Sequence, residues 1–173
     1  YPNNHLALFQ VVSGRKSLEA IYENPEFGPY GVGDYSVRAD LEVARYISSH
    51  TQPEDTIFIW GFDPTIYFLS RRACASRFIY NFPLYGEFQW PQLREQCLAD
   101  LDRNAPPYIV VVKNDQMPWV TGTWEDSRTA LGRFEGLQRM IETDYYLETT
   151  IEDFALYHLS RDRYSVSAGH HKS

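Results

Sequence analysis

The chain has 173 residues, 43% of them hydrophobic and 23% charged, which is typical of one globular domain with a sizeable core. Acidic side chains outnumber basic ones by 23 to 16. This balance argues against general nucleic-acid binding, which needs a basic face. No apolar run approaches the roughly 20 residues that span a bilayer. The start, YPNNHLALFQ, lacks an initiator Met and the basic region of a signal peptide, so we expect a piece of a longer protein.

We predict three parts along the chain. Residues 1–35, with the stretch ENPEFGPYGVGD, form an irregular lead-in, and residues 36–163 form a single α/β domain. Residues 164–173 form a tail, whose ending SAGHHKS resembles an expression-tag remnant or a frayed end more than a metal site.

The first elements of the predicted domain alternate between helix and strand. Residues 37–50 predict a helix capped by Ser36, with one apolar face made of Val37, Leu41, Ala44 and Ile47. QPED ends that helix, and TIFIW at residues 56–60 has the composition of a buried strand. A Gly61-Phe62-Asp63-Pro64 turn follows, in which we expect Asp63 to cap a short helix and Pro64 to lie in its first turn.

The second half continues the alternation. We predict a strand in SRFIYN (76–81), a helix in WPQLREQCLADLDRNA (90–105) and a strand in YIVVVKN (108–114). A helix over 127–143 is expected to point Leu131, Phe134, Leu137 and Ile141 inward, and YYLETTIEDFALYHL reads as a β-hairpin. The predicted fold class is a three-layer α/β domain with a mostly parallel sheet and the hairpin at its edge. Segments 56–60, 76–80 and 108–112 should be parallel neighbours.

Signatures of catalysis are absent from the sequence. The glycines of GPYGVGD match neither a dinucleotide fingerprint nor a P-loop, and there is no G-x-S-x-G elbow. The histidines lack metal-ligand spacing, so we predict no catalytic residue, metal site or cofactor in this chain. Cys74 and Cys97 lie outside any CxxC motif and could form a disulfide or remain two buried thiols, which is the favoured reading.

Aromatic side chains are the unusual feature of the sequence. Ten of them fall between residues 60 and 90, where the carboxyl ends of the first strands should place a ligand site. Rings and arginines there could stack on and hydrogen-bond a sugar or a lipid head group. The candidates for ligand or interface contact are Trp60, Asp63, Tyr67, Arg77 and Tyr85. The favoured alternative is that half of the rings are core and the others pack against a partner.

Several of these residues match a known pattern. In the stretch from Val43 to Pro83, Trp60-Gly61 ends a strand, Pro64-x-Ile66-Tyr67 opens a helix, and Ser76-Arg77-Phe78 follows. The stretch resembles the soluble domain that follows the transmembrane helices of bacterial GT-C glycosyltransferases. These polytopic enzymes include relatives of dolichyl-phosphate-mannose protein mannosyltransferases and of aminoarabinose transferases. Outside those 40 or so residues, only the order of elements agrees.

The resemblance implies an extracytoplasmic, periplasmic domain of an integral membrane protein. The family uses a polyprenyl-phosphate sugar donor, often with a divalent metal, and its catalytic acid lies in a loop between early membrane helices. The isolated domain should therefore be inactive. Its expected partners are the transmembrane part of the same polypeptide and a glycan or lipid-linked acceptor. The alternative is an α/β ligand-binding or protein-interaction module with no transferase attached.

Overall fold

The computed structural model describes residues 37–85 and 90–160. Its five-stranded mixed sheet has the order β2-β1-β3-β5-β4. The strands are β1 (Thr56–Trp60), β2 (Ala73–Cys74), β3 (Tyr108–Val112), β4 (Tyr145–Ile151) and β5 (Phe154–Leu159). Strands β2, β1 and β3 are parallel, whereas β5 and β4 run antiparallel and form a hairpin at the edge. The predicted α/β class, with its terminal hairpin, is confirmed.

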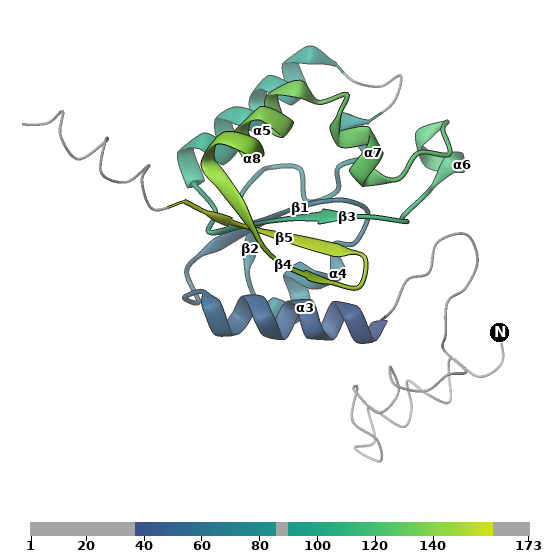
Figure 1. Ribbon diagram of the computed structural model, residues 1–173. Coiled ribbons are helices and arrows are strands. Elements are labelled where there is room, and N and C mark those ends of the chain that lie inside the picture. The colour runs from purple at the N-terminus through teal and green to yellow at the C-terminus, as the bar shows by residue number, and fades with distance from the viewer. Residues whose placement is uncertain (1–36, 86–89, 161–173) are drawn as a thin grey trace, which may run out of the picture.

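Helices cover both faces of the sheet, so the molecule has three layers (Figure 1). One face carries α3 (Val37–His50) and α4 (Thr65–Ser70). The other carries α5 (Pro91–Asn104), α7 (Ser127–Leu131) and α8 (Glu135–Asp144). A short 3₁₀ helix, η2 (Phe82–Leu84), precedes α5, and α6 (Pro118–Thr121) projects beyond the end of β3.

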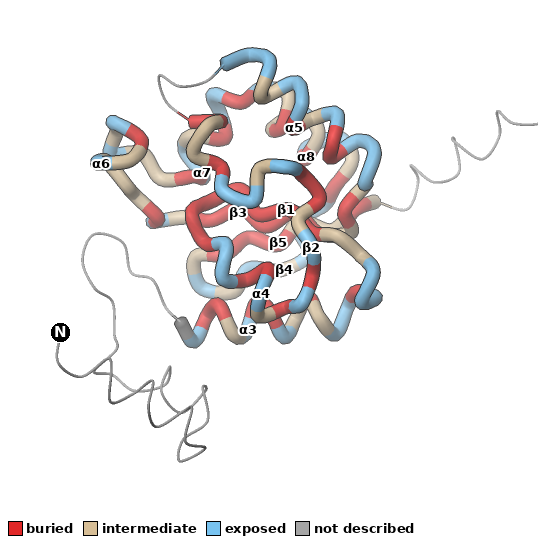
Figure 2. Tube along the Cα trace, turned by 180° about the vertical axis from the view of Figure 1, so that it is seen from behind, coloured by how far each residue is buried: buried red, intermediate tan, exposed pale blue. Residues whose placement is uncertain are grey.

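Alternation along the central strands divides the core into two clusters. Phe58, Trp60, Ile109 and Val111 pack toward α5, α7 and α8, whereas Ile57, Ile59, Val110 and Val112 pack toward α3 and α4. Because both faces are covered, every residue of β3 is buried (Figure 2). The short apolar runs that predicted β1 and β3 are typical of such doubly covered strands.

The structure corrects the predicted strand at residues 76–80. The strand that pairs with β1 on the side away from β3 is Ala73–Cys74, and the chain after it is irregular. Ser76 Oγ accepts a hydrogen bond from Phe78 N at 3.2 Å, and Arg77 N donates to Asp100 Oδ2 at 3.1 Å. These local bonds occupy backbone groups that a strand would pair with its neighbour.

The predicted helix over 127–143 is divided in two. Asp126 caps α7 by accepting from Thr129 N at 2.8 Å, and tight turns from Gly132 to Phe134 then end that helix. The four residues expected to face inward are all buried: Leu131, Phe134, Leu137 and Ile141. Helix periodicity therefore predicted the buried face correctly although the axis breaks.

Smaller predictions have mixed outcomes. Helix α3 buries Ala39, Val43, Ala44 and Ile47, while Leu41 is only half-buried. The two cysteines are free thiols, Cys97 buried and Cys74 partly so, as favoured. The lead-in 1–35, the Ser36 cap and the tail 164–173 lie outside the described residues.

Candidate functional site

The carboxyl ends of β1 and β3 meet at one edge of the sheet, where the sequence predicts a contact site. The chain can turn after β1 because residue 61 is glycine, since a Cβ there would lie 2.3 Å from Val112 Cγ2. Gly61 N donates to Asn81 Oδ1 at 2.9 Å, and Phe62 N donates to Asp115 Oδ2 at 3.2 Å. Side chains from two later loops therefore satisfy the backbone of this turn.

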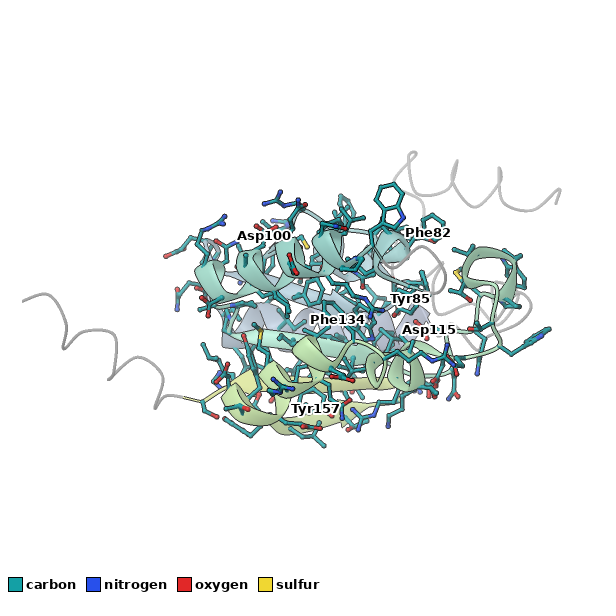
Figure 3. The ribbon with its side chains drawn as sticks, turned by 90° about the horizontal axis from the view of Figure 1, so that it is seen from above. Phe82, Tyr85, Asp100, Asp115, Phe134 and Tyr157 are labelled. Carbon is teal, nitrogen blue, oxygen red and sulfur yellow. The ribbon has the colours of Figure 1, made fainter. Side chains whose placement is uncertain are left out.

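Asp115 is the centre of the polar groups at this edge. Its carboxylate accepts from Ser127 N at 2.7 Å and from Ser127 Oγ at 2.5 Å, and Ser127 Oγ in turn accepts from Tyr85 Oη at 2.6 Å. Burial raises the pKa of Asp115, and the hydrogen bonds from Ser127 and Phe62 oppose that rise. Figure 3 shows Tyr85 and Asp115 toward the same end of the molecule. All three side chains are buried, so this network holds loops together and presents no group to solvent.

Trp60 and Tyr85, two of the candidate contact residues, lie inside the core. Trp60 is 1% exposed and stacks on Tyr85 with ring centroids 4.5 Å apart. The indole Nε1 donates to Ser127 O at 2.8 Å, and the Phe134 ring contacts the indole edge. A sugar could stack on either ring only after the surrounding loops moved.

Tyr67 is likewise buried. Its hydroxyl accepts from Ile59 N at 2.9 Å and from Cys74 Sγ at 3.2 Å, which ties α4 to β1 and β2. Burial, together with nearby Cys74, raises the pKa of Tyr67 well above its ordinary value. The phenol therefore remains neutral. Its hydroxyl accepts from the backbone of Ile59, a residue of β1 that the short strand β2 does not reach.

Asp63 is not the N-cap of α4 that the sequence predicts, but the residue before it. Pro64 is the N-cap residue of α4, and Asp63 Oδ1 accepts from Thr65 N at 3.1 Å, forming a turn just outside the helix. The other oxygen, Oδ2, is buried without a hydrogen-bond partner among the described residues. Asp63 thus stabilises the turn that precedes α4 through one carboxylate oxygen, while the other oxygen makes no hydrogen bond with the described residues.

That oxygen lies in a pair of buried carboxyl groups. Asp40, in the first turn of α3, is 5% exposed and Asp63 is 4% exposed. Asp40 Oδ1, like Asp63 Oδ2, lacks a hydrogen-bond partner within residues 37–85 and 90–160. Burial, the Asp63 carboxyl and Glu152 raise the pKa of Asp40 to about 8. Asp40 is therefore mostly protonated and neutral at pH 7.

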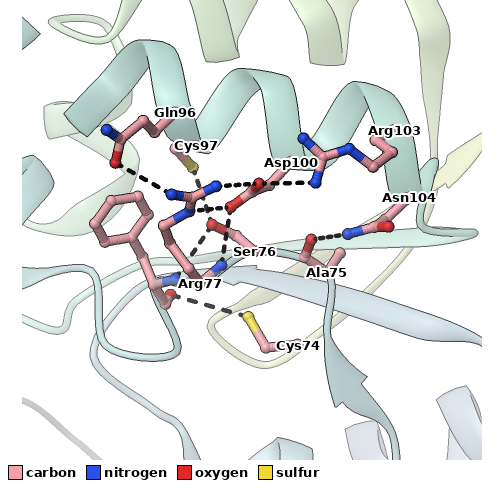
Figure 4. Close-up of polar contacts among 10 residues, drawn as sticks. Cys74, Ala75, Ser76, Arg77, Gln96, Cys97, Asp100, Arg103 and Asn104 are labelled. Carbon is pink, nitrogen blue, oxygen red and sulfur yellow. Dashed lines mark hydrogen bonds and ion pairs between the residues drawn. The ribbon is translucent and has the colours of Figure 1, made fainter. Parts of the chain in front are cut away.

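Arg77 is the exposed member of the candidate set. Its Nε donates to Asp100 Oδ2 at 2.8 Å and its Nη2 to Asp100 Oδ1 at 2.9 Å, a bidentate pair that joins the loop after β2 to α5 (Figure 4). These hydrogen bonds lower the pKa of Asp100 to about 2. The guanidinium already has a fixed partner within the fold.

The sequence reasoning missed the exposed aromatic residues of the loop after β3. Residues 115–127, here called the 115–127 loop, are tied at their ends by the Asp115–Ser127 bonds and by Asn114 N donating to Asp126 Oδ2 at 3.0 Å. Trp119 is 66% exposed and Trp124 is 72% exposed. The signal available in the sequence was two tryptophans in a Gly- and Thr-containing loop, without the periodicity of a helix or strand.

The described residues do not suggest a metal centre or a membrane span. Within them, no group of three or more His, Cys, Asp or Glu side chains could hold a metal ion. Among the described helices, none is both long and apolar enough to cross a membrane.

Comparisons with known proteins give one weak likeness. No protein-family model and no curated protein sequence matches the chain. Among solved structures, the C-terminal globular domain of an oligosaccharyltransferase from Archaeoglobus fulgidus is similar to 69% of this chain and 95% of that one. The identity is 12% and the TM-score 0.39, so the likeness carries no functional argument.

Proposed function

We propose that this chain contains an extracytoplasmic, periplasmic domain of a polytopic bacterial membrane glycosyltransferase. The enzyme would use a polyprenyl-phosphate sugar, with a divalent metal in its membrane part where the family employs one. In this proposal the domain is noncatalytic, faces the transmembrane part of its own polypeptide, and contacts a glycan or lipid-linked acceptor.

One observation carries the proposal beyond the resemblance between Val43 and Pro83. At the carboxyl edge, the polar side chains satisfy one another in the interior, while aromatic side chains project outward. Asp115, Ser127 and Tyr85 are buried, whereas Trp119 and Trp124 are exposed. Interior polar bonding fixes loop positions, and exposed rings favour contact with another surface. This arrangement fits a contact domain better than a reaction centre.

The five candidate residues then take distinct roles. Trp60, Tyr67 and Tyr85 support the carboxyl edge from inside, Asp63 holds the turn before α4, and Arg77 ties the loop after β2 to α5. Direct contact with a glycan or acceptor would come from exposed rings nearby.

The first test is the reading frame upstream of Tyr1. We expect about ten apolar spans of membrane length there. A short polar leader would contradict the proposal and favour the alternative, a ligand-binding or protein-interaction module.

The second test is activity. Membranes containing the longer protein should transfer sugar from a polyprenyl-phosphate donor to acceptor, and the 173-residue chain alone should transfer none. Sugar transfer by the chain alone would overturn the noncatalytic role.

A further inference from the structure

The tip of the 115–127 loop, residues 116–124, has a composition that suits transfer from water to a less polar environment. Nine consecutive residues, 116–124, carry no charged side chain, in a chain that is 23% charged. At one end of this run Asp115 is buried, and at the other Glu125 pairs with Arg133. Moving a charge into an apolar environment is the largest cost of such a transfer, and the tip avoids it.

Part of the backbone of the tip is also satisfied within the loop. Val120 N and Thr121 N donate to Met117 O at 2.8 and 2.9 Å, and Gly122 N donates to Pro118 O at 2.9 Å. Thr121 Oγ1 adds bonds to Met117 O and Thr123 O at 3.1 and 3.0 Å. These groups need not lose a partner when water is displaced from the tip.

The position of the tip matters as much as its chemistry. Helix α3 begins on the same side of the molecule as α6, and β5 ends on the opposite side (Figures 1 and 2). In the proposed function, on which this step rests, the membrane part precedes the domain, and the first described helix begins on the side where the loop projects.

We propose that the tip of the 115–127 loop inserts Trp119 and Trp124 into the interfacial zone of a lipid bilayer. Tryptophan prefers that zone because its ring is apolar while its N–H can bond to water or head groups. The chain has a net charge of −7, so attraction to anionic lipid is not the driving term. Binding should therefore extend to neutral phosphatidylcholine and depend little on salt.

A bilayer fits the tip better than a glycan does. Sugar and ligand sites are concave, with convergent polar groups. The cavity beneath the loop, lined in part by Trp60, Tyr85 and Thr121, has a volume of only about 10 Å³. Larger cavities lie elsewhere: one of about 470 Å³ is lined partly by the end of α5, and one of about 680 Å³ is lined by α3 and β4. Both indoles are mostly exposed and line none of these three cavities, which suits a flat partner.

The test is flotation of the 173-residue chain with phosphatidylcholine vesicles. The chain should float, and Trp119→Ala with Trp124→Ala should lower the bound fraction by about tenfold or more, because two interfacial anchors are lost. Leu147→Ala is the matched control, since Leu147 is an exposed apolar residue of β4, and it should float like the unaltered chain. Vesicles with brominated lipid chains should quench tryptophan fluorescence in the unaltered chain and much less in the double variant.

Three outcomes would overturn the inference. These are no flotation of the unaltered chain, equal flotation of the double variant, and binding that requires anionic lipid and disappears with salt. Resonance shifts at the loop caused by soluble glycans in the absence of vesicles would instead assign the tip to sugar contact. Because flotation needs neither donor nor upstream sequence, its result is independent of the transfer assay that tests the proposed function.

Discussion

Trp60 and Trp124 show how one residue type serves opposite purposes at the same edge of the sheet. Trp60 is enclosed by Tyr85 and Phe134 and donates its indole N–H to Ser127 O. Trp124 lies in the 115–127 loop, which the Asp115–Ser127 bonds close, and most of its surface is exposed. The two rings differ in what surrounds them. The Trp60 ring packs between the sheet and the helices, whereas the Trp124 ring is mostly in contact with water. Ring density in the sequence therefore marks the edge but does not separate scaffold from contact surface.

Removing the interior ring should have the largest effect. Trp60→Ala would leave a cavity between β1, η2 and α8, and we expect a loss of about 4 kcal/mol in the free energy of unfolding. Chemical denaturation followed by far-UV circular dichroism measures it. Trp90→Ala, at an exposed ring preceding α5, is the matched control and should change stability by about 0.5 kcal/mol or less. An equal loss of unfolding free energy in Trp60→Ala and Trp90→Ala would contradict the difference between buried and exposed rings.

The polar network behind the loop should be next in effect. Asp115→Ala removes the acceptor for Ser127 N, Ser127 Oγ and Phe62 N, and we expect a loss of about 3 kcal/mol. Glu125→Ala removes only an exposed ion pair at the other end of the same loop, and its effect should stay below about 1 kcal/mol. Denaturation midpoints compared at one pH decide between a structural and a peripheral role for Asp115.

The buried carboxyl pair predicts a pH dependence. Asp40 has an ordinary pKa of 3.8 and a folded-state pKa of about 8, so between these values the folded chain binds more protons than the unfolded chain. The stability from this group is complete below about pH 4, falls as the pH rises, and is lost as the pH passes about 8.

Asp40→Asn should remove this slope. At pH 8 we expect the variant to be more stable than the unaltered chain by on the order of 2 kcal/mol, since the amide is neutral and can donate to Asp63. Denaturation at several pH values measures the slope, with Glu95→Gln, at an exposed carboxyl of α5, as control. An unchanged slope in Asp40→Asn would mean that Asp40 does not hold a proton at neutral pH in the folded chain.

How far the sequence predicts this structure depends on the range of the forces involved. Strands β1 and β3, the inward residues of α7 and α8, and the hairpin follow from local apolar patterns, and all are observed. The strand prediction for residues 76–80 was wrong. The aromatic and β-branched residues there suggest a strand, whereas side-chain hydrogen bonds of Ser76, Arg77 and Asp100 hold the segment in an irregular conformation. Asp100 lies on a later helix, and that partner cannot be read from local composition.

Of the candidate contact residues, Trp60, Asp63, Tyr67 and Tyr85 are buried, and Arg77 is exposed. Trp60 directly precedes Gly61 and Tyr67 follows Pro64 closely. Local sequence does not indicate that loops from residues 81–85 and 115–127 cover that side. Their burial depends on contacts such as Trp60 Nε1 to Ser127 O, which joins positions 67 residues apart. Whether any of the five candidates contacts a ligand stays a prediction.

The exterior rings should have the smallest effect on stability. Trp119→Ala and Trp124→Ala should each change the free energy of unfolding by about 0.5 kcal/mol or less, because their side chains are mostly in water and fill no space inside. The 115–127 loop should keep its shape, since its ends are fixed by Asp115 and Asp126 and its tip by backbone bonds from Val120 to Gly122. Thermal and chemical denaturation of the two single variants give the measurement. Neutral stability combined with lost vesicle binding would separate the exterior rings from the Trp60 core in one pair of proteins. A loss above about 2 kcal/mol in either variant would instead show that the ring packs on the fold, and the interior and exterior tryptophans would then differ in degree only.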